Sequence, residues 1–286
     1  LVRLVPGDPV TAMLGPRATP ERRAALEHSL ALDRPIWVQY VAFLGGIARG
    51  DLGDSLWKKQ PVAVVLSDRL PPTLFLTLYS FVLSLVLTVP LATWAALNQG
   101  RWPDHLVRAF VLASLAMPAY WVGMMLLQWF AVKQRLFPVS GWGDGFVGHL
   151  HALFLPSVAL ALAIASVTIR SLRAAILETL SADYVRTARA KGLTDRSVFV
   201  RHVLRNSALS SLTILGVIFA FVIGGTTIIE TIFAIPGLGQ LIVTAIFQRD
   251  YPVIQGVTLT IGVIVLLTNL FIDLGYAALD PRVTLG

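Results

Sequence analysis

The sequence has 286 residues, of which 56% are hydrophobic and only 14% are charged, and its net charge is +7. Soluble domains carry about 25% charged residues, so this composition argues against a soluble enzyme, a disordered tail and a nucleic-acid-binding protein. The chain contains no cysteine, which excludes disulfides and thiolate chemistry.

Residues 1–68 are expected to form an external segment that contains short helices at the membrane interface. Thr19-Pro20-Glu21 pairs a cap residue with a proline, which predicts the start of a helix. The apolar stretch 36–44 is too short to span a bilayer, and its aromatic residues favour a helix that lies in the headgroup region of membrane lipid. The composition of 50–55 predicts turns.

Residues 69–286 are expected to form a transmembrane domain, because five long stretches lack Asp, Glu, Lys and Arg. These stretches measure 31, 24, 25, 24 and 22 residues. A helix needs about 20 apolar residues to cross a bilayer core of about 30 Å, and such uniform runs favour helices over alternating barrel strands. We therefore predict an all-α polytopic membrane protein, a helical bundle with spans at 71–97, 109–132, 153–175, 207–229 and 253–276.

Two of the predicted spans contain a proline, Pro90 in the first and Pro118 in the second. Proline removes a backbone hydrogen bond and so predicts a kink at each position, either for packing alone or for opening a path. A sixth charge-poor run, 231–248, contains Ile235-Pro236-Gly237-Leu238-Gly239. This turn chemistry predicts a loop or a partly re-entrant segment rather than a span.

The basic residues are distributed unequally between the two sides of the predicted bundle. Eleven Lys and Arg fall in 98–108, 170–206 and the C-terminal tail, against three in 133–152 and 230–252. The positive-inside rule therefore places the first set, and the C-terminus, in the cytoplasm. Five spans then place residue 1 outside, and no signal peptide is visible. We expect that one upstream helix is missing from this sequence and that the intact protein has six spans.

The loop 176–206 is the longest predicted cytoplasmic connection. Ser181 can cap a helix that carries Asp183 in its first turn and that Gly192 ends. Asp195 can cap a second helix that leads into the next span. The loop is therefore predicted to be a helix–turn–helix that lies across the cytoplasmic face of the membrane.

The first helix of this loop combines small and basic side chains, namely Ala188 and Ala190 with Arg186, Arg189 and Lys191. Small residues allow another protein to approach closely, and basic residues attract it. Physical chemistry alone leaves open the alternative of a solvated basic loop on anionic lipid.

The stretch 183–193 resembles the coupling-loop motif of ABC-importer permeases, in the dipeptide, oligopeptide and nickel branch. Arg186-Thr187-Ala188 stands where the family has Glu-Ala-Ala, and Gly192 stands at the matching glycine. Further segments that are similar to the same branch follow in its order, at 4–9, 50–55, 69–73, 230–239, 249–252 and 279–282.

This resemblance implies the type I ABC-importer permease fold and a transport subunit of the bacterial inner membrane that is not an enzyme. The chain lacks the Gly-x4-Gly-Lys-Ser/Thr phosphate loop, so it would carry no cofactor, and ATP and Mg²⁺ would bind to partner chains. The implied partners are a second homologous permease, two cytoplasmic ATPases and an extracytoplasmic substrate-binding protein. Di- and oligopeptides are the expected substrates, and nickel complexes or other small solutes remain open. A stand-alone secondary transporter is the alternative from another class, but no inverted repeat is visible.

The resemblance assigns ATPase coupling to Asp183, Arg186, Ala188, Arg189, Ala190, Lys191 and Gly192. A charge at the bilayer centre costs at least about 2.5 kcal/mol, so ionisable residues near spans are candidates for a function. Asn269 and Asp273 share a helix face and can line a path or can fix two helices. Glu230, beside the Pro-Gly turn, and Pro118 are the other candidates for the path or its gate.

The sequence contains no convincing catalytic or metal-binding constellation. His149 and His151 alternate in a predicted external loop, but no third metal ligand is evident near them. We therefore assign no metal site.

Overall fold

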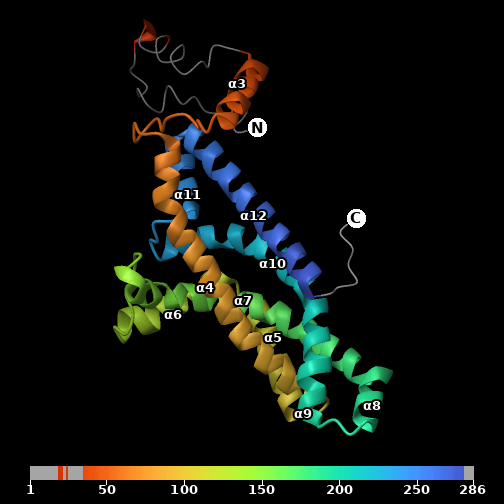
Figure 1. The fold of residues 1–286 in the computed structure, drawn as a ribbon. Coiled ribbons are helices and arrows are strands. Elements are labelled where there is room, and N and C mark those ends of the chain that lie inside the picture. The colour runs from red at the N-terminus through yellow and green to blue at the C-terminus, as the bar shows by residue number, and fades with distance from the viewer. Residues whose placement is uncertain (1–18, 22–23, 25–34, 280–286) are drawn as a thin grey trace. The chain divides into compact units, whose positions relative to one another are not determined.

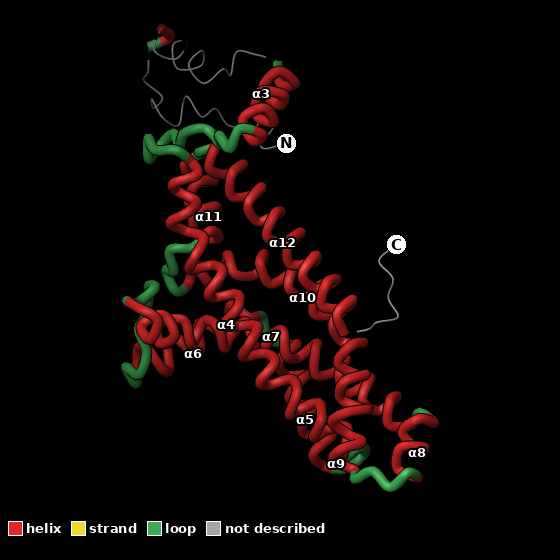
Figure 2. Tube along the Cα trace, viewed as in Figure 1, coloured by secondary structure: helices red, strands yellow, loops and turns green. Residues whose placement is uncertain are grey.

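The computed structural model describes residues 19–21, 24 and 35–279. Within these residues the regular elements are helices, and the one bridge of β type is the isolated pair Asp54 and Pro61 (Figures 1 and 2). This confirms the prediction of an all-α protein. The helices are α3 (Ile36–Ala48), α4 (Val62–Leu97), α5 (Trp102–Ala116), α6 (Ala119–Leu126), the π-helix η2 (Leu127–Lys133), α7 (Gly145–Ser181), α8 (Asp183–Ala190), α9 (Asp195–Val198), the π-helix η3 (Phe199–Leu204), α10 (Arg205–Ile232), α11 (Leu238–Gln248) and α12 (Tyr251–Leu279).

Three helical stretches in the described part of the chain are long and apolar enough to cross a membrane. They are α4, α7 and residues Tyr251–Phe271 of α12, and they coincide with the first, third and fifth predicted spans. The helix pair formed by α5 with α6 and η2 is a fourth candidate if it is counted as one span. The fourth predicted span, 207–229, lies within α10.

The kink predicted at Pro118, within the span 109–132, is confirmed and is a sharp break between two helices. Trp102–Ala116 and Ala119–Lys133 are separate helical segments that meet at an angle of 97°. The break falls at Met117 and Pro118, which both have extended backbone conformations. Proline disfavours a helical conformation in the residue before it, which explains the extended Met117. By contrast, α4 continues through Pro90 without a break.

The predicted loop over 231–248 is a turn followed by a helix. The turn is confirmed at 233–237, where Ala234 has a positive φ of 46° and the N–H of Ile235 donates to the carbonyl of Glu230. A plain loop is wrong for Leu238–Gln248, which form the short apolar helix α11, and the alternative of a partly re-entrant segment stays a prediction.

The chain divides into two compact units. Unit 1 combines the chain up to Thr73 with Pro236–Gly262, and unit 2 combines Leu74–Ile235 with the chain from Val263 onward. Each unit is described by itself below.

Unit 1 is held together by contacts between segments far apart in the sequence. The buried carboxylate of Asp250 accepts hydrogen bonds from the hydroxyl of Ser55 (2.5 Å) and the N–H of Leu56 (3.2 Å). The first N–H of α11, on Leu238, donates to the hydroxyl of Thr73 (2.8 Å). The predicted turns at 50–55 and the end of α11 are thereby joined in one structure.

The described parts of the predicted external segment agree with the elements that were predicted there. Pro20 and Glu21 are helical directly after Thr19. The apolar stretch predicted over 36–44 is α3, which continues to Ala48 and exposes the side chains of Trp37 and Tyr40. Its position at the membrane interface stays a prediction.

Unit 2 is organised around α7, which packs against α5, α6 and α10. One apolar core joins the last turns of α4 and the middle of α5 to the second half of α7 and to the helices that follow it. A second core joins Leu76 of α4 to the first half of α7 and to the end of α10. The hydroxyls of Thr88 and Thr168 lie 2.6 Å apart and connect α4 to α7.

Candidate functional site

The predicted coupling helix is α8, and it is seated on the core of unit 2. Val185 and Ala188 are buried on one face of α8, in the same apolar cluster as Ile176 of α7. Val198 and Val203, from α9 and η3, complete this cluster beneath the helix. An isolated helix of eight residues is marginal in water, so this buried face is what holds α8 in place.

The end of α8 requires a glycine. Gly192 has a φ of +81°, and its N–H donates to the carbonyl of Arg189 (2.9 Å). The N–H of Leu193 reaches back to the carbonyl of Ala188 (3.4 Å), which completes a Schellman motif. The predicted role of Gly192 as the helix stop is therefore confirmed.

The two predicted N-terminal caps of the helix–turn–helix are wrong. Ser181 donates its hydroxyl hydrogen to the carbonyl of Glu178, and α8 begins after Ala182, which makes no side-chain cap. The second helix, α9, is capped by Thr194, whose hydroxyl accepts from the N–H of Ser197 (3.4 Å). Asp195 instead forms an ion pair with Arg189 across the turn (3.2 Å).

Polar contacts between residues distant in the sequence connect α10 to α8 and to the end of α7. The amide of Asn206, in the first turn of α10, donates to the hydroxyl of Tyr184 (3.0 Å). The hydroxyl of Ser207 donates to Thr179 near the end of α7 (3.1 Å). Partners separated by more than 20 residues leave no local sequence signal, so these hydrogen bonds could not have been predicted from the sequence.

Six of the seven predicted coupling residues lie on the exposed side of this loop. Arg186 has 75% of its side chain exposed and forms a weak pair with Asp183 (3.7 Å). Ala188 is the exception, because it is buried in the core. Its small side chain therefore serves the packing of α8 on unit 2 rather than the outer surface. The exposed predicted residues are Asp183, Arg186, Arg189, Ala190, Lys191 and Gly192.

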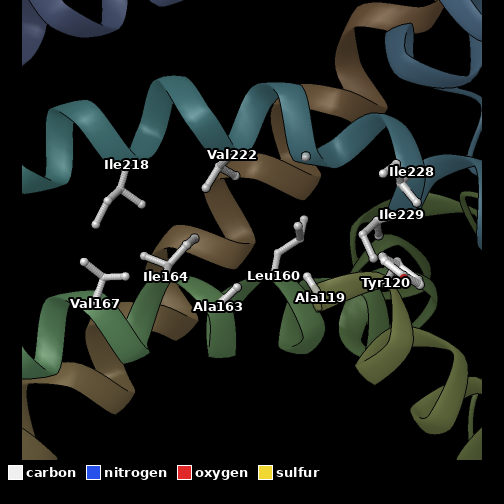
Figure 3. A pocket seen from close by; sticks show the side chains of 11 residues that line it. Ala119, Tyr120, Leu160, Ala163, Ile164, Val167, Ile218, Val222, Ile228 and Ile229 are labelled. Carbon is white, nitrogen blue, oxygen red and sulfur yellow. The ribbon is translucent and has the colours of Figure 1, made fainter. Parts of the chain in front are cut away.

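A cavity of about 430 Å³ lies between α6, α7 and α10 (Figure 3). In Figure 3 the side chains of Ile218 and Val222 on α10 face those of Ile164 and Val167 on α7. The lining side chains are aliphatic except for Tyr120, which carries a hydroxyl group. The lining residues are Ala119, Tyr120, Leu160, Ala163, Ile164, Val167, Ile218, Val222, Gly225, Ile228 and Ile229.

The broken helix borders this cavity and a second one. Ala119, the first residue of α6, lines the larger cavity and also a smaller cavity of about 260 Å³, which Met117 borders as well. Non-helical backbone within a membrane is tolerated where it is buried in protein or lines a cavity. The break at Pro118 satisfies this condition, because Met117 and Ala119 on either side of it line these cavities.

Residues 88–285 match the family described as the binding-protein-dependent transport system inner membrane component. Residues 1–77 match the N-terminal region of the same kind of membrane component. The chain belongs to this family. It is accordingly a permease component of a binding-protein-dependent ABC importer, a multi-pass protein of the bacterial inner membrane without catalytic activity or a cofactor of its own.

The permease is similar over nearly its whole length to curated relatives. It is 37% identical over 286 residues to a probable peptide ABC transporter permease of Sinorhizobium fredii, covering 99% of this chain and 91% of that protein. It is 36% identical over 309 residues to the dipeptide transport system permease of Escherichia coli, with the same coverage. A glutathione transport system permease of Salmonella typhimurium is 36% identical over 282 residues, covering 99% and 90%.

Solved structures show the same fold at low sequence identity. An inward-facing structure of the MetNI methionine ABC transporter has a TM-score of 0.63 at 17% identity, covering 76% of this permease and 96% of that chain. An amino acid ABC transporter crystallised with histidines has a TM-score of 0.58 at 15% identity, covering 76% and 94%.

The predicted path residues of the permease lie in different surroundings. Pro118 is exposed at the helix break, and Asn269 is exposed on α12. Glu230 is 0% exposed, so in this conformation its carboxylate is not available to a solute or to a protein outside. The side chain of Asp273 lies outside the described residues.

His149 and His151 do not lie in a loop, as predicted, but in the first two turns of α7, and each bonds to a backbone carbonyl of the preceding segment. His149 bonds through Nδ1 to the carbonyl of Trp142 (3.0 Å) and stacks on the indole ring of the same residue. His151 bonds through Nε2 to the carbonyl of Leu136 (2.9 Å). Among the described residues there is no group of three side chains arranged as metal ligands.

Proposed function

We propose that this permease forms half of a path for the uptake of di- and oligopeptides. The relatives that carry peptide, dipeptide and glutathione transport in their names support this substrate class. The proposed assembly contains a second homologous permease, two cytoplasmic ATPases that bind ATP and Mg²⁺, and an external substrate-binding protein. In this assembly the chain has five spans of the type I fold and a cytoplasmic C-terminus.

The single observation that carries the proposal is the construction of α8. One face of α8 is fixed to the core by Val185 and Ala188, and the other face presents charged side chains to the outside. A helix of this kind moves with the body to which it is fixed, and its charges steer and hold a second protein. We infer that α8 docks on an ATPase through Asp183, Arg186, Arg189, Ala190, Lys191 and Gly192.

The proposed mechanism follows from this seating. Dimerisation of the ATPases on ATP displaces α8, and the shared apolar core carries the displacement to α5 and α7. The helix break at Pro118 and the adjoining cavity between α6, α7 and α10 then change shape, which opens the path to the outside. Pro118, Glu230, Asn269 and Asp273 are the proposed path or gate residues, with Glu230 becoming accessible only in another conformation.

The function is tested by uptake of labelled dipeptides and oligopeptides in a strain that lacks the chromosomal permease, with Ni²⁺ supplied in parallel. Arg186→Glu combined with Lys191→Glu should abolish uptake and the copurification of the ATPase. The matched control is Arg101→Glu, which reverses an exposed charge in the other predicted cytoplasmic connection and should leave both intact. Uptake of Ni²⁺ without peptide would refute the substrate class, and retained ATPase binding in the double variant would refute the docking surface.

A further inference from the structure

A partly buried ion pair joins two segments of unit 2 that the proposed mechanism requires to move together. Asp104 lies in the first turn of α5 with 1% of its side chain exposed, and Arg173 lies on α7 with 19% exposed. Arg173 donates from Nε to Oδ1 of Asp104 (2.7 Å) and from Nη2 to Oδ2 (2.8 Å). The N–H of Gly100 donates to the same Oδ2 (3.0 Å).

The paired hydrogen bonds fix the orientation of the two side chains as well as the distance between them. Two parallel hydrogen bonds between a guanidinium and a carboxylate hold the two planes in one orientation. Apolar side chains of similar volume often stabilise a fold as well as a buried ion pair does, so stability alone does not account for such a pair. What the pair adds to an apolar contact is resistance to sliding of α5 along α7.

The pair lies where the coupling helix joins the membrane domain. Val107 of α5 and Ile176 of α7 are both three residues from the ion pair in sequence, and both belong to the apolar core that seats α8. From Arg173 the helix α7 continues without interruption to Ser181, and α8 begins two residues later. A displacement of α8 therefore reaches the end of α7 first.

On the α5 side, the ion pair is linked to the helix break at Pro118. From Asp104, α5 continues to Ala116 and ends at the break, beside the two cavities. We propose that Asp104 and Arg173 are a positioning pair that makes α5 follow α7, so that movement of α8 reaches the break at Pro118. This inference rests on the proposed function and names the residues that transmit its energy.

The pair can be distinguished from a purely structural contact by the ratio of uptake to ATP hydrolysis. Arg173→Lys keeps the charge but removes the paired hydrogen bonds, and we expect uptake per ATP hydrolysed to fall at least tenfold while complex assembly and ATPase activity stay within twofold. Arg108→Lys is the matched control, because Arg108 is 51% exposed and approaches Asp104 only to 3.7 Å. The control should keep the ratio of the unaltered complex.

A second variant tests the same role if Arg173→Lys prevents the permease from folding. Asp104→Leu combined with Arg173→Met replaces the pair by apolar side chains that can pack in the same space. We expect this complex to assemble with its ATPases and to hydrolyse ATP with little uptake. The exchanged pair, Asp104→Arg with Arg173→Asp, should recover part of the ratio.

Each outcome bears on one conclusion. If the apolar variant assembles and imports with the ratio of the unaltered complex, the positioning role is refuted. The same holds if Arg173→Lys and Arg108→Lys give equal ratios. If the unaltered complex imports no peptide, the proposed function fails on its own, and the ratio is then measured with the solute that the complex does import.

Discussion

Substitution of Gly192 tests whether the coupling helix depends on backbone conformation or on free space. Gly192 has a φ of +81°, and a Cβ added there would meet no other atom of the chain within 4 Å. An L-residue at this position is therefore strained without being crowded. The free energy of forming the end of α8 should therefore rise by about the same amount for Gly192→Ala and Gly192→Val. Valine adds only the further cost of its β-branched side chain.

The expected magnitude follows from the conformational penalty. The left-handed region costs an L-residue roughly 1–2 kcal/mol, and asparagine tolerates it better than other residues do. A penalty of one or two kcal/mol changes a population ratio by about 5- to 30-fold. Because α8 has only eight residues, this penalty acts on a helix that has little stability of its own. We expect uptake to fall by about that factor in Gly192→Ala, and to fall much less in Gly192→Asn.

The assay compares peptide uptake and ATPase activity in membrane vesicles that contain the complete transporter. Gly50 supplies a matched control, because it follows the end of α3 with a φ of +75° and equally free surroundings. Gly50→Ala carries the same backbone strain outside the coupling loop and should leave the coupling of uptake to ATP hydrolysis unchanged. If Gly192→Ala imports normally and only Gly192→Val fails, bulk against a partner is the cause and the argument from backbone strain is wrong.

Three further experiments test packing within each of the two units, each by the melting temperature of the purified complex in detergent. A Cβ on Gly256 would lie 2.6 Å from Cγ1 of Val62, so Gly256→Ala should destabilise by about 1–3 kcal/mol through overpacking, and a second change, Val62→Ala, should restore stability. Asp250→Ala removes a buried acceptor and should cost about 1–3 kcal/mol, whereas an unchanged melting temperature would contradict the role of Asp250 in unit 1. Thr88→Val and Thr168→Val, singly and together, should reveal a coupling of about 0.6 kcal/mol, and strict additivity would contradict the hydroxyl contact.

The helical character of the charge-free runs was predictable because the bilayer imposes a simple condition on the backbone. A segment that has no water around it must satisfy its own N–H and C=O groups, so long runs without charge can be assigned as helices from the sequence. The ends of the helices do not follow from this condition. α7 covers Gly145–Ser181 whereas the span was predicted over 153–175, because the ends of a charge-free run do not mark the ends of a helix.

Breaks and turns were less predictable, because the same local signal has different outcomes. Pro90 and Pro118 both lie within charge-free runs, yet only Pro118 separates two helices. Near Gly237 the glycines and the proline predicted a loop, but α11 begins at Leu238, whose N–H is bonded by Thr73. That partner is 165 residues distant, and no window of the sequence contains both residues.

In the loop 176–206, too, features that depend on adjacent residues were predicted, whereas contacts with distant residues were not. Its helix, its glycine stop and its exposed basic residues follow from adjacent residues, and the sequence predicted all three. Asp104 was not singled out, because it lies in a connection that also carries Arg101 and Arg108 and therefore resembles an ordinary solvated charge. Only the approach of α7 turns it into a buried partner of Arg173. The residues that we propose to meet a partner outside the chain are thus visible in local patterns, whereas the residues that we propose to transmit motion inside the chain become visible only once the helices are packed.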